Sequence, residues 1–378
     1  MKKIKDILTI TLFSIVIFGI CGLFFLIPDK EVSLAERRKL AKFPELTMER
    51  ALSREFSGEL ESYLLDHFPF REPLRSLNSF GRFNILKQKD VNGLWVDGDN
   101  IFKHDKPFDE NQVKYGIGLI ERVCNTYLND MNVYYSIIPD KTYFAPQNNL
   151  HPRLDYDKLL DMLRKGITKA KYIDIFDTLE LDDYYRTDTH WSQDKIYPTA
   201  KKLAKEMEMG EYLLGESEYK KNSLSPFYGV YWGQVALGLK PDELHYLSSQ
   251  YTENAKVSGV DPVILKENFG VEIDTDERVY ALDRFDGTDG YDVFLSGMQP
   301  IITVECENAK TDRELVIFRD SFGSSIAPLF TGAYSKITLV DLRYIPSMLI
   351  GEFVEFNPNQ DALFLYSASM VNSSMLMK

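Results

Sequence analysis

Cysteine, histidine and net positive charge are all scarce in this chain. Three cysteines and five histidines are spread over 378 residues, and the formal net charge is −13. So few cysteines cannot build a disulfide framework, and no Cys-x-x-Cys or clustered Cys/His spacing supports a structural metal site. The acidic balance argues against a nucleic-acid-binding protein, because phosphate backbones are held by clustered Lys and Arg. It also argues against broad adhesion to an anionic surface.

Apolar residues, by contrast, are plentiful. They make up 44% of the sequence, which is enough to bury a large core and places the chain among globular proteins. The length fits either one large α/β domain with accessory elements or two domains. No internal repeat or low-complexity tract divides the chain.

The N-terminus carries one long apolar run. Residues 7–27 contain no charge, and as a helix rising about 1.5 Å per residue they can span the hydrocarbon core. Lys2, Lys3 and Lys5 precede the run, which predicts a cytoplasmic N-terminus and an exported remainder. A cleaved signal peptide is the alternative, but its apolar region would be unusually long. We therefore expect a single-pass cell-membrane protein, with residues 1–30 as tail and anchor.

Two cysteines lie beyond this anchor. Cys21 falls inside the apolar run, which leaves Cys124 and Cys306 in the exported part. An exported pair can form a disulfide, and two reduced, buried thiols are the alternative. The sequence leaves both open.

The rest of the chain divides by its pattern of apolar residues. Residues 31–90 are rich in charges and helix formers, and we expect a helical lead-in that packs on the main domain. Over residues 91–378, nearly continuous apolar strands alternate with helices, beginning with the run NVYYSII at 132–138. This predicts an α/β domain with a doubly wound, mostly parallel sheet and helices on both faces. Residues 207–298 lack the rhythm and are expected to form an insertion of loops and some antiparallel strand.

The first candidate site is the string TDTHWS at residues 187–192. An aspartate two residues before a histidine can set its carboxylate against the ring Nδ1–H, which leaves Nε2 free as a general base. This assigns Asp188 and His190 as a catalytic pair, with Trp191 as an apolar wall that lowers the local dielectric constant. The alternative is a capped helix with an incidental histidine. Of the other histidines, we expect His67 to be structural.

The second candidate site is the string IFRDSFGSS at residues 317–325. A predicted buried strand ends here, and Ser321 follows it at the start of a helix, where reacting groups gather in open α/β sheets. Backbone N–H groups at a helix start can hold an oxyanion, and Gly323 would let a substrate carbonyl approach closely. Arg319 puts a cation beside the serine, where it either stabilises an oxyanion or pairs with a carboxylate. The alternative for Ser321 is an ordinary helix N-cap.

These strings resemble the DHHW family and the related alginate O-acetylation proteins of the SGNH hydrolase superfamily. Asp188-x-His190-Trp191 is similar to the family's Asp-x-His-Trp motif. Asp320-Ser321 is similar to the block that carries the family's nucleophile. Shorter strings extend the likeness over about residues 33–370: ERRKL at 36–40, DHFPFR at 66–71, Pro139-x-Lys141 and Asp341-x-Arg343.

Two positions depart from the family's pattern. Thr189 stands at the second residue of a literal Asp-His-His-Trp, which is its first histidine, and Arg319 takes the place of the glycine in a Gly-Asp-Ser block. The first departure lies between two functional residues and is permissive. The second leaves the role of Arg319 open.

The resemblance implies an SGNH-like fold and a triad of Ser321, His190 and Asp188. Family members act outside the cytoplasm on cell-surface polysaccharides, commonly beside a membrane-bound O-acyltransferase that supplies acetyl groups. The resemblance therefore implies an O-acetyltransferase that forms an acetyl-serine and needs no cofactor. Lys141 and Tyr228 are placed beside the substrate, although the aromatic string around Tyr228 is equally suited to stacking on sugar faces or to forming core.

Three alternatives to an O-acetyltransferase stay open. A polysaccharide acetylesterase would pass the same acetyl group to water. A non-catalytic scaffold of a polysaccharide-modifying complex would not use the serine at all. A glycan-binding component would bind polymer without turning over an ester.

Overall fold

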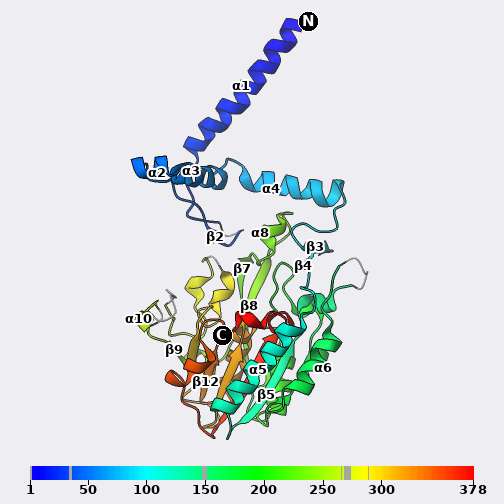
Figure 1. The fold of residues 1–378 in the computed structure, drawn as a ribbon, viewed down its shortest axis with the longest axis vertical. Helices are drawn as coiled ribbons and strands as arrows, with labels where there is room; N and C mark the ends of the chain where they lie inside the picture. Colours follow the sequence, from blue (N-terminus) through cyan, green and yellow to red (C-terminus); the bar gives the residue numbers. More distant parts are fainter. Residues whose placement is uncertain (1, 34–35, 147–150, 265, 268–273, 288) are drawn as a thin grey trace.

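The molecule has three parts along its long axis. The computed structural model describes residues 2–33, 36–146, 151–264, 266–267, 274–287 and 289–378. Figure 1 shows helix α1 (Lys2–Leu26) at one end, a layer of short helices across its end, and a larger α/β part that carries the C-terminus. The layer thus lies between α1 and the α/β part.

The α/β part is built on a seven-stranded sheet. Its strand order is β6-β5-β13-β11-β12-β10-β9. The strands are β6 (Lys171–Tyr172), β5 (Asn132–Ile138), β13 (Gln360–Ser367), β11 (Glu314–Arg319), β12 (Lys336–Val340), β10 (Ile301–Glu305) and β9 (Lys256–Gly259). The first five are parallel, and the last two add an antiparallel edge. The predicted α/β class with a mostly parallel sheet is confirmed.

Side chains of the central strands alternate between two cores. Leu315 and Ile317 of β11 face one core, while Val316 and Phe318 face the other. Helices α5 (Glu110–Tyr127) and α6 (Tyr156–Gly166) cover the second core, and α7 (Tyr197–Glu206) and α11 (Ser321–Ile326) cover the first. Because each strand is buried on both faces, it appears in the sequence as a continuous apolar run.

The region 207–298 is only partly separate from this sheet. As expected, it contains an antiparallel pair, β7 (Lys220–Phe227) with β8 (Asp242–Ser248). Its strand β9 nevertheless joins the main sheet by pairing with β10. Short helices complete the α/β part: α8 (Trp232–Val235), α9 (Gln250–Asn254), α10 (Pro262–Ile264) and α12 (Ala368–Val371).

Cys124 and Cys306, the two cysteines beyond α1, lie on opposite faces of the sheet. Cys124 belongs to the core under α5, and Cys306 belongs to the core on the other side. Both are free and buried, and burial raises the pKa of each thiol to about 12. Of the two alternatives, the structure therefore shows two reduced, unreactive thiols.

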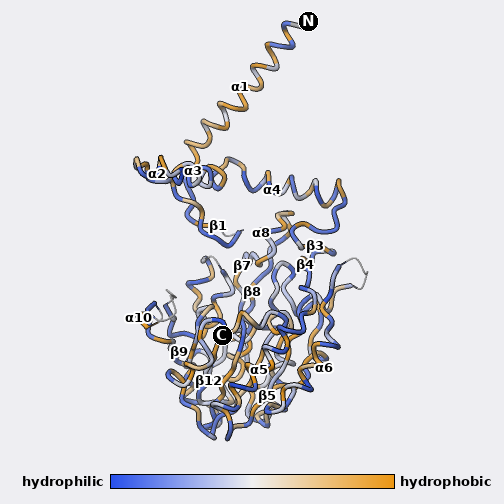
Figure 2. The backbone as a smooth tube through the Cα atoms, viewed as in Figure 1, coloured by the Kyte–Doolittle hydropathy of each residue, from blue (hydrophilic) through white to orange (hydrophobic). Residues whose placement is uncertain are grey.

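The lead-in forms the layer of short helices. It contains a two-stranded pair, β1 (Val32–Ser33) with β2 (Arg38–Lys39), and the helices α2 (Met48–Leu52), α3 (Glu55–Asp66) and α4 (Arg71–Phe80), which a π-helical turn continues through Gly81–Ile85. The hairpin of β3 (Leu94–Asp97) and β4 (Asn100–Lys103) follows and leads into the α/β part. Figure 2 shows apolar and polar positions mixed along this layer, whereas α1 is mostly apolar.

Helix α1 is long and apolar enough to cross a membrane. The segment Lys3–Leu26 meets this test, and its apolar stretch has no part buried inside the protein. A membrane anchor and a signal sequence share this length and composition. The structure therefore establishes a helix long enough to span a membrane.

Candidate active site

Neighbouring strands end at one edge of the sheet, where the candidate serine lies. Asp320 follows β11, and its carboxylate accepts hydrogen bonds from the Ser367 N–H at the end of β13 (2.8 Å) and from the Phe322 N–H (3.1 Å). Asp320 is therefore the N-cap of α11. The N-cap alternative for Ser321 is wrong, because Asp320 takes that position and leaves the serine hydroxyl free to face a histidine.

Asp188 and His190 lie on a tight loop that a β-bridge between Tyr184 and Trp191 closes. His190 Nδ1 lies 2.7 Å from Asp188 Oδ1, and His190 Nε2 lies 2.7 Å from Ser321 Oγ. One hydrogen-bonded chain thus joins segments that are 131 residues apart in the sequence. A Ser-His-Asp triad requires this geometry.

The carboxylate of Asp188 is fully buried and accepts several hydrogen bonds. Its Oδ1 accepts from the backbone N–H of His190 (3.0 Å) as well as from the ring, and its Oδ2 accepts from the Val230 N–H (2.6 Å) and from Arg37 Nη1 (3.1 Å). Burial alone would raise the pKa of Asp188, but His190 and Arg37 outweigh it and hold this pKa well below its usual range. Asp188 therefore stays ionised and can orient and stabilise a protonated His190.

The sequence did not single out Arg37, which the structure places at the site. It lies in the lead-in between β1 and β2, has a left-handed backbone (φ 54°), and exposes only 11% of its side chain. Its guanidinium bridges Asp188 and Asp289. In the same loop as Asp289, burial raises the pKa of Asp292 to about 7. The string ERRKL marked this segment as part of the family resemblance, but nothing in the string indicated that Arg37 pairs with Asp188.

The aromatic string around Tyr228 serves to hold the Asp188 loop. A Cβ on Gly229 would lie 2.2 Å from the Thr187 carbonyl oxygen, so only glycine lets the two segments approach closely enough for the Val230 N–H to reach Asp188. The Tyr228 ring packs edge-on against Trp232, 4.7 Å between centroids. Tyr228 lines a cavity of about 520 Å³ toward the lead-in, and no triad residue lines that cavity.

Two buried aromatic residues, Tyr291 and Trp191, support the segments that carry His190 and Ser321. The Tyr291 ring stacks on His190, with centroids 4.0 Å apart, and its hydroxyl donates to Ser325 Oγ (2.7 Å). Trp191 Nε1 donates to the same oxygen (2.8 Å), and the Trp191 side chain is fully buried. Trp191 thus supports α11 and cannot form a wall that touches substrate. Tyr291 was missed, since no local pattern marks a tyrosine that packs on a distant histidine.

Arg319 and Gly323 form a packing pair. Arg319 is buried, and its Nη1 lies 3.4 Å from Asp341 Oδ2, so of the two predicted roles the structure shows pairing with a carboxylate. Burial lowers the pKa of Arg319. A Cβ on Gly323 would lie 2.5 Å from Arg319 Cβ, and the Gly323 N–H already donates to the Asp320 carbonyl (3.1 Å). Gly323 therefore makes room for arginine rather than for substrate.

The donor at this helix start that suits an oxyanion is the Ser321 N–H. It belongs to the first residue of α11, and the first N–H groups of a helix have no intrahelical partner. The N–H groups of Phe322 and Gly323 are already used by Asp320. The Gly323 N–H is therefore not available to an oxyanion, and the Ser321 N–H is the expected donor at this helix start.

Lys141 is a buried structural cation. Its Nζ donates to the carbonyl oxygens of Ile101 (3.0 Å), Tyr185 (2.7 Å) and Arg186 (2.7 Å), and so ties β4 to the chain just before Asp188. Burial lowers the pKa of Lys141 to about 7. All three hydrogen bonds are made within the protein, which explains Lys141 without a substrate.

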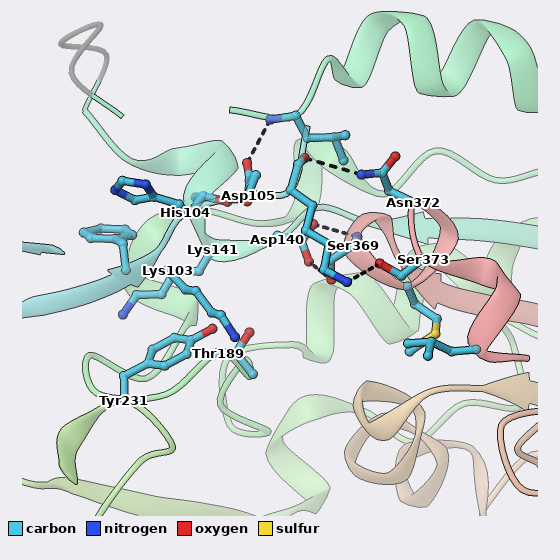
Figure 3. Close-up of a pocket in the computed structure, with 16 residues that line it drawn as sticks. Lys103, His104, Asp105, Asp140, Lys141, Thr189, Tyr231, Ser369, Asn372 and Ser373 are labelled. Atoms are coloured by element: carbon cyan, nitrogen blue, oxygen red, sulfur yellow. Dashed lines mark hydrogen bonds between the residues drawn. The ribbon is translucent and has the colours of Figure 1, made fainter. Parts of the chain in front are cut away.

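A cavity of about 250 Å³ opens beside Thr189, the residue between Asp188 and His190 (Figure 3). Lys141 and Asp140 line it. The Asp140 carboxylate accepts from the Ser369 N–H (2.9 Å), the Ser369 hydroxyl (2.7 Å) and the Tyr156 hydroxyl (3.1 Å). The Asp140 carboxylate is thus satisfied within the protein, and it connects the segment after β5 to the start of α12.

Comparisons with solved structures identify proteins of similar fold. A DHHW family protein from Eubacterium siraeum superposes with a TM-score of 0.57 at 19% identity, over 76% of this chain and 97% of its own. Bacillus cereus PatB1, solved with a sulfonyl adduct, superposes with a TM-score of 0.56 at 15% identity, over 75% and 98%. The O-acetyltransferase domain of Pseudomonas putida AlgJ gives 0.43 at 12% identity, over 74% and 92%. No protein-family profile and no curated protein matches the sequence.

At these identities the likeness concerns the fold. The chain has an SGNH-like α/β fold, with a serine at the end of a central strand facing a histidine. Superposition on a DHHW family protein confirms, at the level of the fold, the resemblance that the strings at 187–192 and 317–325 indicated.

The hydrogen bonds of Lys141 predict that it is needed for stability. In Lys141→Met, three buried carbonyl groups lose their donor, and we expect the free energy of unfolding to fall by roughly 2–5 kcal/mol. Urea unfolding of the detergent-solubilised chain, followed by tryptophan fluorescence, measures this loss. The matched control is Lys103→Met, an exposed lysine of the same cavity, which should change stability by less than about 0.5 kcal/mol. Equal stability of both variants would contradict the structural role.

Proposed function

We propose that this protein is an O-acetyltransferase that acts outside the cytoplasm on a cell-surface or secreted polysaccharide. The hydrogen-bonded chain of Asp188, His190 and Ser321 carries the proposal, because a serine nucleophile needs a base and an oriented carboxylate at these distances. The choice of acetyl group and polysaccharide rests on the resemblance of the sequence motifs to the DHHW family.

The reaction would proceed through an acetyl-serine. His190 Nε2 takes the proton of the Ser321 hydroxyl as Ser321 Oγ attacks the acetyl carbonyl carbon. The Ser321 N–H stabilises the oxyanion, and Asp188 stays ionised beside the imidazolium. When the tetrahedral intermediate collapses, the leaving oxygen takes the proton from His190. A sugar hydroxyl then attacks the acetyl carbon and gives its proton to His190 Nε2. The bond from the acetyl carbon to Ser321 Oγ breaks, and His190 returns the proton to Ser321 Oγ.

Transfer and hydrolysis share the first half of this reaction. If water attacks the acetyl-serine, the protein is an acetylesterase. The two differ in whether a sugar hydroxyl outcompetes water, which an assay with and without an oligosaccharide acceptor measures. An acceptor-dependent acetylated product supports transfer, and release of acetate at the same rate with or without acceptor supports the esterase.

The source of acetyl groups follows from the proposed location. If α1 is a retained anchor, the three lysines before it place the α/β part outside the cytoplasm. Acetyl-CoA is not expected there, so the donor would come through a membrane-bound O-acyltransferase partner. The net charge of −13 gives no reason to expect nucleic acid as a partner.

The triad predicts that single and double variants lose activity equally. Ser321→Ala removes the nucleophile and His190→Ala removes the base, so each should lower turnover of 4-nitrophenyl acetate by several orders of magnitude, and the double variant should be hardly worse. His67→Ala and His104→Ala are the matched controls and should keep most activity. A sulfonyl fluoride should label Ser321, since PatB1, of the same fold, was solved with a sulfonyl adduct.

A folded Ser321→Ala protein that still turns over the ester would move the chemistry elsewhere. A wild-type chain that binds polymer but neither reacts with the sulfonyl fluoride nor turns over any acetyl ester would favour the scaffold or the glycan-binding alternative. Peptide mass spectrometry after labelling identifies the modified residue.

The Arg37 contact predicts a shift in pH dependence. Asp188 has to be ionised to stabilise a protonated histidine, so the labelling rate falls where low pH protonates this carboxylate. Arg37→Gln removes a positive charge that helps to hold the pKa of Asp188 well below its usual range, so this pKa rises and the acid limb moves to higher pH. The control is Arg38→Gln, because Arg38 pairs with Glu36 and Asp66. A loss of rate in Arg37→Gln that is uniform across pH would indicate a purely structural role.

The charges around α1 predict the orientation of the chain. An alkaline phosphatase fused after Lys378 should be active in bacterial cells, because that enzyme folds only outside the cytoplasm and the lysines keep the N-terminus inside. Changing Lys2, Lys3 and Lys5 to glutamate should lower that activity, and deleting residues 1–26 should abolish it. Intact mass of the purified chain reports whether α1 is retained.

A further inference from the structure

Helix α4 has one face that contacts the rest of the protein. Arg71 and Arg75 both pair with Glu36, and Arg75 also donates to the Gly233 carbonyl oxygen at 2.5 Å. Ser79 is buried. At about 100° per residue, positions 71, 75 and 79 share one side of the helix. This side is polar and faces the α/β part.

The opposite side of α4 is apolar and uncovered. Phe70, Leu74, Leu77 and Phe80 expose 60%, 48%, 67% and 48% of their surface, and we call these four residues the α4 stripe. Surface helices of soluble proteins place polar residues on their outer side, so the stripe reverses the usual arrangement. Further exposed apolar side chains of the layer are Leu46, Met48, Leu52, Leu65, Ile85 and Leu86.

The layer is attached to the end of α1. The Phe24 ring, near the last turn of α1, lies 5.7 Å from the Tyr63 ring of α3. The Tyr63 hydroxyl donates to Asp29 just beyond α1 (2.9 Å). The Phe43 ring also packs on the Tyr63 ring, with centroids 5.2 Å apart. These contacts hold α3 at the level where a membrane-spanning α1 leaves the hydrocarbon. Figure 1 shows α2, α3 and α4 crosswise to α1 in one layer.

We propose that this layer lies on the outer surface of the lipid bilayer, with the α4 stripe inserted among the headgroups and the first acyl carbons. The proposal rests on α1 as a retained anchor, but not on the acetyltransferase activity. Three observations favour lipid as the occupant: the stripe lies opposite the face that contacts the α/β part, the layer is attached where α1 ends, and its helices cross the direction of α1. An amphipathic helix in the plane of the interface has this arrangement.

The binding is expected to depend on apolar insertion rather than on charge. Acidic and basic side chains are mixed along the layer, as in the pairs of Arg50 with Glu59 and of Arg75 with Glu72. A surface held by electrostatics would present clustered Lys and Arg instead. Vesicles of neutral phosphatidylcholine should therefore be sufficient.

Spin labels in the full chain test this proposal. Cysteines are placed at Leu77 or Phe80 in the stripe, with Asn78, an exposed neighbour on the same side of α4 as Arg71, as the matched control. Lys165 on α6 serves as the aqueous reference. The background is Cys21→Ala, because Cys124 and Cys306 are buried. Each nitroxide-labelled protein is reconstituted in phosphatidylcholine vesicles, and its relaxation by oxygen and by a water-soluble nickel chelate is compared.

We expect the ratio of oxygen to nickel accessibility to be several-fold higher at Leu77 and Phe80 than at Lys165. The ratio at Asn78 should lie between the value for the stripe and the value for Lys165. Nickel accessibility at Leu77 and Phe80 equal to that at Lys165 would overturn the proposal. Protection from both reagents would also overturn it and would assign the stripe to a protein partner, and dipolar broadening between labels would identify that partner as a second copy. Sulfonyl fluoride labelling of Ser321 is a separate readout, so an inactive protein can still give a lipid-facing stripe.

Discussion

Asp188 carries a negative charge with no exposed surface, and most of the site is arranged around this constraint. An unpaired buried carboxylate would be strongly destabilising, so its oxygens must be matched by donors. Here the donors come from three separate parts of the chain: Arg37 from the lead-in, Val230 from the region 207–298, and the ring and backbone of His190. The loop before Asp188 is held in turn by Asp242, whose carboxylate accepts from the Thr187 N–H (2.8 Å) and hydroxyl (2.7 Å). Only when these parts are docked can His190 face Ser321.

This dependence links the lead-in to the candidate site. Arg37 belongs to the lead-in, and its neighbour Glu36 is the residue on which Arg71 and Arg75 of α4 converge. The helical layer is therefore connected by ion pairs to the segment that neutralises Asp188. A shift of the helical layer would disturb Asp188, because a buried charge is strongly destabilised by the loss of a single partner. The lead-in is part of the site and not merely a spacer.

The departure from a Gly-Asp-Ser block also has a structural account. An arginine at position 319 must be buried, because β11 is covered on both faces. Asp341 supplies the opposite charge, and Arg343 binds the same carboxylate at 2.9 and 2.6 Å. Gly323 leaves the space that the arginine side chain fills. The arginine is thus accommodated in the core at the end of β11, where it pairs with Asp341.

Local sequence determined the strands, the α/β class and the two segments that carry Asp188, His190 and Ser321. Runs such as NVYYSII are strands wherever both faces are buried, and an aspartate two residues before a histidine can bond its ring without help from elsewhere. Tertiary structure alone decided the roles of Arg37, Tyr291, Lys141 and Arg319. Each role depends on a contact between segments far apart in the chain: Arg37 and Asp188 are 151 residues apart, and Tyr291 stacks on His190 from another loop. No periodicity or spacing encodes such contacts, because they arise only when the sheet brings its loops to one edge.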